Sequence, residues 1–230
     1  LTNLCNYIMD NSPPDSIGIV DTMGCATPEA IKHMVRWVNE MTGLPIEIHT
    51  HNDFGMGVAT ELAAVTAGAV CVHSCANGLG ERTGNAALEE LMMGLHLLYG
   101  YDTNYKLDKI PELAAMIAEK SNIPIARNKP VLGQGNFIRE SGIGINYVMN
   151  DPLVMFATHP SLTGKEGEVG LGKKSGKASI IYKMGELGLG ELDDDKIAKI
   201  LDEVKATGIA KRDVLTNEEF TNIVSSINDA

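Results

Sequence analysis

The sequence has no apolar run that approaches the roughly 20 residues needed to cross a membrane as a helix. Its start also lacks the charged, apolar and small-residue segments of a secretion signal. Basic residues are few, since 19 lysines and arginines stand against 30 aspartates and glutamates, for a formal net charge of -11. Such a charge disfavours binding to nucleic acid or anionic membranes, although a local basic pocket can still bind a small anion. We therefore expect a globular protein that binds neither nucleic acid nor membrane.

Cysteine is also scarce and shows no metal-binding or redox spacing. The sequence holds four cysteines and no Cys-x-x-Cys pair. They are Cys5, Cys25, Cys71 and Cys75. Because Cys71 and Cys75 fall around an apolar run, we predict that they are reduced and buried, in a cytoplasmic protein. Filling of the core explains each of the four without any functional role.

An initiator methionine is absent, because the chain opens with Leu1. The first residues, 1–9, have the pattern of the end of an amphipathic helix. We therefore expect that the sequence begins inside a longer protein.

Short apolar segments alternate with helical patterns over residues 16–99. The expected strands are 16–20, 45–48 and 69–74, and the expected helices are 27–43, 55–67 and 86–99. This order is typical of βαβ winding with a parallel sheet, and it fits both a doubly wound sheet and a barrel. In both architectures ligands bind at the carboxyl ends of the strands.

Polar side chains gather at those ends. They are Asp21 and Thr22 after the first strand, His49 and His51 at the second, and Asn77 and Asn85 after the third. Residues i and i+2 of a strand share a face, so the two histidines project together and could bind one divalent metal ion. A structural pair or a solvent-facing strand would give the same pattern.

The neighbouring polar residues also have structural interpretations. Asn85 heads a helix, so it could act as an N-cap or supply an amide oxygen to a metal. Asp21 and Thr22 could form a turn. Glu81 and Arg82 could pair and brace the glycine-rich loop.

Three segments together resemble a known family. They are Val20-Asp21-Thr22-x-Gly24, His49-x-His51-Asn52-Asp53-x-Gly55, and Asn77-Gly78-x-Gly80-Glu81-Arg82-x-Gly84-Asn85. In this order they resemble the metal-dependent acyl-CoA condensing enzymes and lyases, a family that includes 2-isopropylmalate, homocitrate and citramalate synthases and hydroxymethylglutaryl-CoA lyase. The segment Leu171–Lys177 resembles the region that follows the barrel in the synthases, which favours that branch.

The resemblance implies the last part of a TIM barrel, about three β/α units of a (β/α)8 fold, followed by a mostly helical region. The implied metal ligands are His49, His51 and Asn85, and the metal would be Mg, Mn or Zn. Thr22, Asp21, Asn52 and Glu81 would bind substrate. The implied substrates are acetyl-CoA and a 2-oxo acid, whose carbonyl the metal would polarise.

The chain departs from the family at its start. The family's first strand carries an Asp-Arg-Glu group, which does not occur here, and a complete barrel needs roughly 250 residues. We therefore expect a partial catalytic domain at 1–101 and an arm with helical subdomains at 102–230. The missing strands would belong to a longer protein or to a partner subunit. A homodimer would form through the region after the barrel.

A second departure concerns proton transfer. The synthases usually carry two histidines in the arm after the barrel, and Arg139 and Gly144 occupy those positions here. Arginine cannot act as a base near neutral pH. His159 is a substitute candidate, although a histidine in a surface loop would look the same.

Three interpretations of function follow from these residues. The first is an acyl-CoA-dependent condensation that yields a 2-hydroxy-dicarboxylic acid. The second is a carbon–carbon lyase or aldolase that uses the same metal site. The third is a non-catalytic paralogue or subunit that binds metabolites.

Overall fold

The computed structural model describes residues 1–229, and the chain divides into two compact units. The first unit is Leu1–Leu132 and the second begins at Gly133. This division describes compactness and does not test the predicted end of the catalytic domain after residue 101, which stays a prediction. In the structure, α5 (Ile110–Ser121) belongs to the first unit, where the Asn77 amide nitrogen donates to the Ala114 carbonyl at 2.9 Å.

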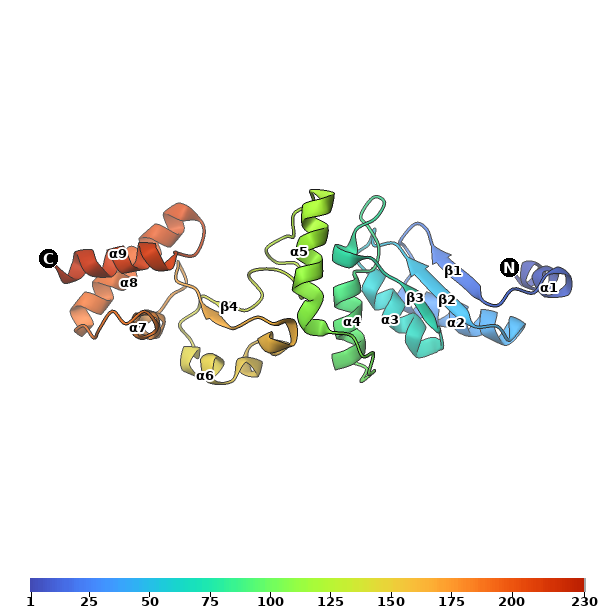
Figure 1. The fold of residues 1–230 in the computed structure, drawn as a ribbon, viewed down its shortest axis with the longest axis horizontal. Coiled ribbons are helices and arrows are strands. Elements are labelled where there is room, and N and C mark those ends of the chain that lie inside the picture. Colours follow the sequence, from blue (N-terminus) through green and yellow to red (C-terminus); the bar gives the residue numbers. More distant parts are fainter. Residues whose placement is uncertain (230) are drawn as a thin grey trace. The chain divides into compact units, whose positions relative to one another are not determined.

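The first unit is an α/β structure in which parallel strands alternate with helices (Figure 1). The strands are β1 (Ile17–Asp21), β2 (Ile46–Thr50) and β3 (Cys71–His73). The other helices are α1 (Thr2–Asn11), α2 (Pro28–Thr42), α3 (Gly57–Ala67) and α4 (Leu88–Leu97), with 3-10 turns η1 (Ala76–Gly78) and η2 (Leu107–Lys109). The strand order is β1-β2-β3. The predicted α/β class with a parallel sheet is confirmed.

The three helices expected at 27–43, 55–67 and 86–99 are present, with ends within two residues of those ranges. The Thr27 hydroxyl accepts a hydrogen bond from the Ala30 amide at 3.2 Å, with Pro28 in the first helical position of α2. Gly43 and Gly68, with φ of +68° and +110°, end α2 and α3 in the left-handed conformation that favours glycine.

One face of the sheet forms the core of the first unit. Ile46 and Ile48 of β2 are fully buried, together with Val35 of α2 and Ala64 of α3. Ile46 and Ile48 occupy alternate positions of β2, so Glu47 and His49 point to the opposite face of the sheet.

The opposite face is open among the described residues. Val20 is 55% exposed there, and Cys71 and His73 are exposed as well. The predicted burial of Cys71 is therefore wrong, and Cys75 is only partly buried. The physical reason is strand alternation, because Val72 packs toward the helices and its neighbours on β3 point away from them. All four cysteines have free thiols, as predicted.

A buried carboxyl joins α3 to the second strand. The Glu61 side chain is fully buried, and its Oε1 accepts hydrogen bonds from the Thr50 amide at 3.3 Å and the Thr50 hydroxyl at 3.2 Å. Its Oε2 is buried and has no hydrogen-bond partner among the described residues. Desolvation raises the pKa of Glu61 to about 8, so the carboxyl is mostly protonated at neutral pH.

The second unit combines helices with a short two-stranded parallel ribbon. The strands are β4 (Ile138–Arg139) and β5 (Glu168–Val169), and Ile138 is in register with Glu168. The helices are α6 (Ile145–Asn150), α7 (Lys177–Glu186), α8 (Asp194–Lys211) and α9 (Asn217–Asn228), with 3-10 turns η3 (Pro152–Val154) and η4 (Pro160–Thr163).

The core of the second unit is built mainly from the last three helices. Ile180 and Ile200 are fully buried, and Phe220 is 1% exposed, in the same cluster as Leu171. The predicted mostly helical region is confirmed, although α6 was not predicted. No helix within residues 1–229 is long and apolar enough to span a bilayer.

We predict that Glu61→Gln removes a pH dependence of stability. The folded state retains a proton on Glu61 up to about pH 8, whereas an unfolded glutamate loses it near its usual value of 4.5. Stability therefore falls as pH rises through this window, and the unfolding equilibrium constant of the wild type should rise, relative to the variant, by up to about tenfold per pH unit. Urea denaturation between about pH 5 and 8 measures the difference.

Glu81→Gln is the matched control, because it removes one negative charge from a side chain that is 81% exposed. Parallel stability curves for the wild type and Glu61→Gln would contradict the prediction.

Candidate metal and substrate site

The loops that follow the strands meet at the carboxyl edge of the sheet. His51 forms an antiparallel bridge with Asn85, and the Ala86 amide donates to the Thr50 carbonyl at 3.3 Å. The His51 amide donates to the Asp21 carbonyl at 3.2 Å. Backbone hydrogen bonds thus bring the ends of β1 and β2 and the loop after β3 to one place.

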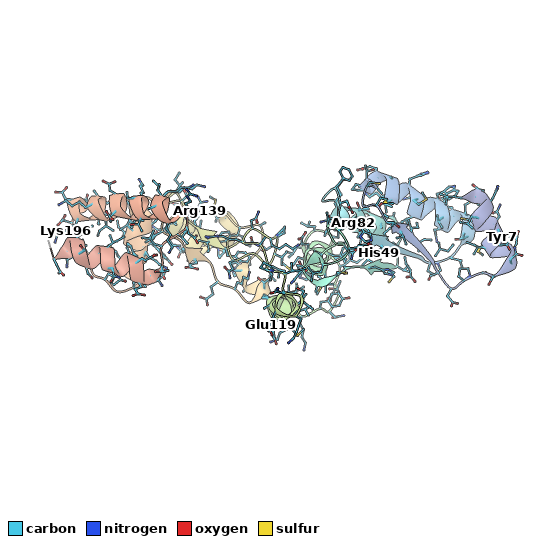
Figure 2. All side chains as sticks on the ribbon, turned by 90° about the horizontal axis from the view of Figure 1, so that it is seen from above. Tyr7, His49, Arg82, Glu119, Arg139 and Lys196 are labelled. Carbon is cyan, nitrogen blue, oxygen red and sulfur yellow. The ribbon has the colours of Figure 1, made fainter. Side chains whose placement is uncertain are left out.

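The two predicted metal-binding histidines lie next to each other in this region. The ring centroids of His49 and His51 are 5.1 Å apart, with the rings nearly perpendicular. His49 is partly buried on β2, and Figure 2 shows it in the same part of the molecule as Arg82. Burial and the nearby His51 and His73 lower the pKa of His49, which favours the neutral imidazole that binds a metal.

Two buried atoms in the site have no hydrogen-bond partner among the described residues. They are His51 Nδ1 and Asn85 Oδ1. The side-chain nitrogen of Asn85, Nδ2, donates to the Leu79 carbonyl at 3.2 Å and to Cys75 Sγ at 3.3 Å. These bonds fix the orientation of the side-chain amide group. Buried polar atoms are normally satisfied, so these two unpartnered atoms fit the role of ligands to a cation. The metal role of His49, His51 and Asn85 stays a prediction.

Of the predicted substrate-binding residues, Asp21 and Asn52 use side-chain oxygens to hold loops. The Asp21 carboxylate accepts from the amides of Cys25 at 3.2 Å and Ala26 at 3.0 Å. Asn52 Oδ1 accepts from the Gly57 amide at 2.9 Å, at the start of α3. These contacts match the turn that the sequence left open for Asp21, and the substrate roles stay predictions.

Thr22 and Glu81 both lie next to Arg82, which forms an ion pair with Asp53 that braces the loop. Arg82 donates from Nε to Asp53 Oδ1 at 2.9 Å and from Nη2 to Asp53 Oδ2 at 3.1 Å, and also to the Thr22 carbonyl at 2.6 Å. Hydrogen bonding from Arg82 lowers the pKa of Asp53. Glu81 lies 3.6 Å from the guanidinium and is largely exposed. The loop is therefore braced chiefly by Asp53, whereas the sequence suggested Glu81.

The glycine-rich loop depends on a close backbone approach at Gly84. Its φ is +86°, and a Cβ placed there would lie 1.9 Å from the Gly78 carbonyl oxygen. Asn85 follows directly, and its amide donates to that same carbonyl at 3.1 Å. The absence of a side chain at Gly84 therefore allows the turn that sets Asn85 beside His51.

A second cluster, which was not predicted from the sequence, lies on the open face of the sheet. Glu47, Cys71 and His73 offer ligand atoms that all lie within 4.8 Å of one another. Glu47 is in register with Cys71, and His49 with His73. The signal was available in the alternation Glu47-x-His49 and Cys71-x-His73, but it becomes visible only when the register of the two strands is known.

The predicted proton-transfer positions lie in the second unit. Arg139 of β4 donates to the Ile143 carbonyl at 3.1 Å, and Gly144 precedes α6 with φ of +74°. His159 Nδ1 accepts from the Ser161 amide at 3.3 Å and lies 2.7 Å from the Ser161 hydroxyl. His159 thus caps η4, and its catalytic role stays a prediction.

Comparisons with known proteins give a consistent result. The sequence profile of the HMGL-like family matches residues 2–117. A homocitrate synthase from Methanopyrus kandleri is 37% identical over 93% of this chain and 53% of its own length. From Methanocaldococcus jannaschii, a 2-isopropylmalate synthase is 38% identical over 93% of this chain and 42% of its own length. An (R)-citramalate synthase from that organism is 35% identical over 84% of this chain and 39% of its own length. The chain thus spans about half the length of these relatives or less.

We predict that Gly84→Ala destabilises the first unit more than Gly43→Ala. Both glycines have positive φ, but a Cβ at Gly43 meets no atom within 4 Å. Gly43→Ala should therefore cost only the left-handed strain of about 1 kcal/mol. Gly84→Ala adds the clash with Gly78, so its loss of unfolding free energy in urea should be clearly larger. Equal losses would contradict the prediction.

Proposed function

We propose that this chain, which belongs to the HMGL-like family, forms part of an enzyme that condenses an acyl-CoA with a 2-oxo acid. The observation that carries the proposal is the pair of buried, unpartnered atoms, His51 Nδ1 and Asn85 Oδ1, beside the neutral His49 imidazole. The names of the relatives support it, because they are homocitrate, citramalate and 2-isopropylmalate synthases.

We assign a divalent cation, Mg, Mn or Zn, to His49, His51 and Asn85. When bound, the cation would polarise the carbonyl of the 2-oxo acid. Two of the metal ligands would be positioned before the cation binds. The backbone hydrogen bonds of His51 and the side-chain hydrogen bonds of Asn85 fix these two residues. Such fixed groups reduce the reorganisation needed when charge develops on the carbonyl oxygen.

The substrate groups would bind around this edge of the sheet. We assign the carboxylate of the 2-oxo acid to Thr22. Asp21, Asn52 and Glu81 would bind other groups of the substrates. In the reaction the methyl carbon of acetyl-CoA loses a proton and forms a bond to the keto carbon, whose oxygen gains a proton. Water then cleaves the thioester, releasing CoA and a 2-hydroxy-dicarboxylic acid.

The three strand–helix units would form part of a (β/α)8 barrel. The open face of the sheet supports this assignment, because β2 and β3 place the polar residues Glu47, His49 and His73 there and β1 adds the exposed Val20. In a closed barrel this face would be the interior. The remaining strands would come from further polypeptide in the same protein or in a partner subunit. We also assign the cytoplasm as its location, and a homodimer through the second unit.

A second candidate is a carbon–carbon lyase or aldolase that uses the same metal site. The observation in its favour is the pair Arg139 and Gly144, which stand where the synthases usually carry histidines. Gly144 has φ of +74°, a backbone conformation that a histidine adopts only with strain. Cleavage uses the same polarised carbonyl as condensation, so the metal ligands do not distinguish the two reactions.

The reaction is tested by incubating the complete protein with acetyl-CoA and a series of 2-oxo acids while free thiol is measured. Thiol release with at least one acid is expected. No release with any acid, together with cleavage of a 3-hydroxy acid or its CoA ester, would replace the proposal with the lyase. Neither reaction, in protein that retains metal, would point to a metabolite-binding paralogue.

We predict that His49→Ala and His51→Ala each lower the affinity for the divalent metal and nearly abolish turnover. Removal of one imidazole leaves the cation with an incomplete coordination shell, so the loss of affinity should exceed about tenfold. Isothermal titration with Mn²⁺ and Zn²⁺, alongside the thiol assay, measures both effects. His33→Ala is the matched control, because His33 is an exposed histidine on α2. Wild-type activity in either site variant would refute the metal assignment.

A further inference from the structure

The open face of the sheet carries three different metal-binding groups from two neighbouring strands. Glu47 belongs to β2, and Cys71 and His73 belong to β3. Register pairs Glu47 with Cys71, and His73 lies two residues further along β3 on the same face. Their ligand atoms, a carboxylate oxygen, the thiol sulfur and an imidazole nitrogen, all lie within 4.8 Å of one another.

The groups are also oriented toward one another. His73 Nε2 lies 3.1 Å from Glu47 Oε2, and the Ser16 hydroxyl donates to Glu47 Oε1 at 2.6 Å. Ser16 therefore holds one carboxylate oxygen and leaves the other directed at the imidazole. Metal-binding carboxylates are commonly held in this way by a hydrogen bond from outside the coordination shell.

We infer that Glu47, Cys71 and His73 form a second divalent-metal site, selective for Zn²⁺ or a similar borderline-soft cation. A ligand set of sulfur, nitrogen and oxygen suits zinc, whereas Mg²⁺ prefers oxygen ligands. Three protein ligands leave a fourth tetrahedral position for water or another group. This site uses none of the residues His49, His51 and Asn85 to which the proposed function assigns its metal.

The distances are compatible with one ion. Zinc bonds of about 2.0 to 2.3 Å place two tetrahedral ligand atoms roughly 3.3 to 3.6 Å apart. The imidazole and carboxylate are already at 3.1 Å, and the remaining separations are at most 4.8 Å. Cys71 and His73 are exposed in this chain, so their side chains have room to rotate toward a shared ion. In the closed barrel of the proposed function, this ion would lie in the barrel interior.

Binding at this site would have a local consequence for the first one. The His73 and His49 ring centroids are 5.8 Å apart. A cation on His73 would therefore place positive charge beside His49. On binding, the Cys71 thiol would lose its proton to solvent, as would His73 Nε2 where it carries one, because thiolate and neutral imidazole are the ligand forms.

The site is tested by titrating the metal-free full chain with Co²⁺, whose bond to a thiolate gives a near-ultraviolet charge-transfer absorption. The wild type should show this absorption, and added Zn²⁺ should remove it. Cys71→Ser should abolish it, and His73→Gln should weaken Co²⁺ binding by more than about tenfold. Cys25→Ser is the matched control, since Cys25 is an exposed free cysteine outside the cluster.

Ser16→Ala tests the positioning of the carboxylate. It removes only the hydrogen bond to Glu47, so it should lower affinity for Co²⁺ by about tenfold while the thiolate absorption keeps its shape at saturation. An unchanged affinity in Ser16→Ala would contradict the positioning role of Ser16, and an unchanged affinity in Glu47→Gln would remove Glu47 from the site.

The outcomes separate this inference from the proposed function. The absence of a thiolate absorption in the wild type, or its persistence in Cys71→Ser, would overturn the second site even if the enzyme condenses its substrates. Loss of the absorption in His49→Ala would also overturn it, because the sulfur would then belong to the first site. A thiolate absorption that survives in His49→Ala and His51→Ala supports the second site whether or not the protein shows condensation activity.

Discussion

The backbone pairing of His51 with Asn85 is the interaction on which the candidate site depends. Parallel strands bring their carboxyl ends to one edge, but they do not bring loop residues together by themselves. Here the loop after β3 returns to the end of β2, where the Asn52 amide donates to the Gly84 carbonyl at 3.0 Å and the Ala86 amide donates to Thr50. Asn85, which lies 34 residues after His51 in the sequence, is thereby held beside it through main-chain hydrogen bonds. Side-chain motion does not disturb these bonds.

The buried side of β2 is held by Glu61, whose carboxyl is mostly protonated at neutral pH. The protonated carboxyl of Glu61 contacts both the amide and the hydroxyl of Thr50, the residue between the two histidines. The Thr50 hydroxyl oxygen also lies 3.1 Å from the Gly57 carbonyl oxygen, a second acceptor within reach of its proton. A charged group at this depth would carry a large desolvation cost, whereas the neutral acid can bind the strand within the core. The histidines therefore project from a strand whose buried side is fixed to α3.

Local signals in the sequence predict the helices and strands of residues 16–99 and the family, because each depends on a few neighbouring residues. The proximity of Asn85 to His51 followed from the order of motifs along the chain. Burial of Cys71 could not be predicted correctly, because an apolar run does not reveal which alternate positions face the helices. The cluster of Glu47, Cys71 and His73 required the register of β2 and β3, a long-range property that no single segment carries. The loop-holding roles of Asp21 and Asn52 required the positions of backbone amides.

The site residues differ in whether their polar atoms are already used by the fold. The oxygens of Asp21, Asn52 and Asp53 accept hydrogen bonds within the first unit, so a substrate would have to share or displace those contacts. His51 Nδ1 and Asn85 Oδ1 are buried and have no such bond among residues 1–229. An unsatisfied buried polar atom costs stability, and a bound ligand that satisfies the atom offsets this cost. The metal assignment therefore rests mainly on His51 Nδ1 and Asn85 Oδ1, which have no partner within the described part of the fold. The number of polar side chains at the sheet edge supports it less.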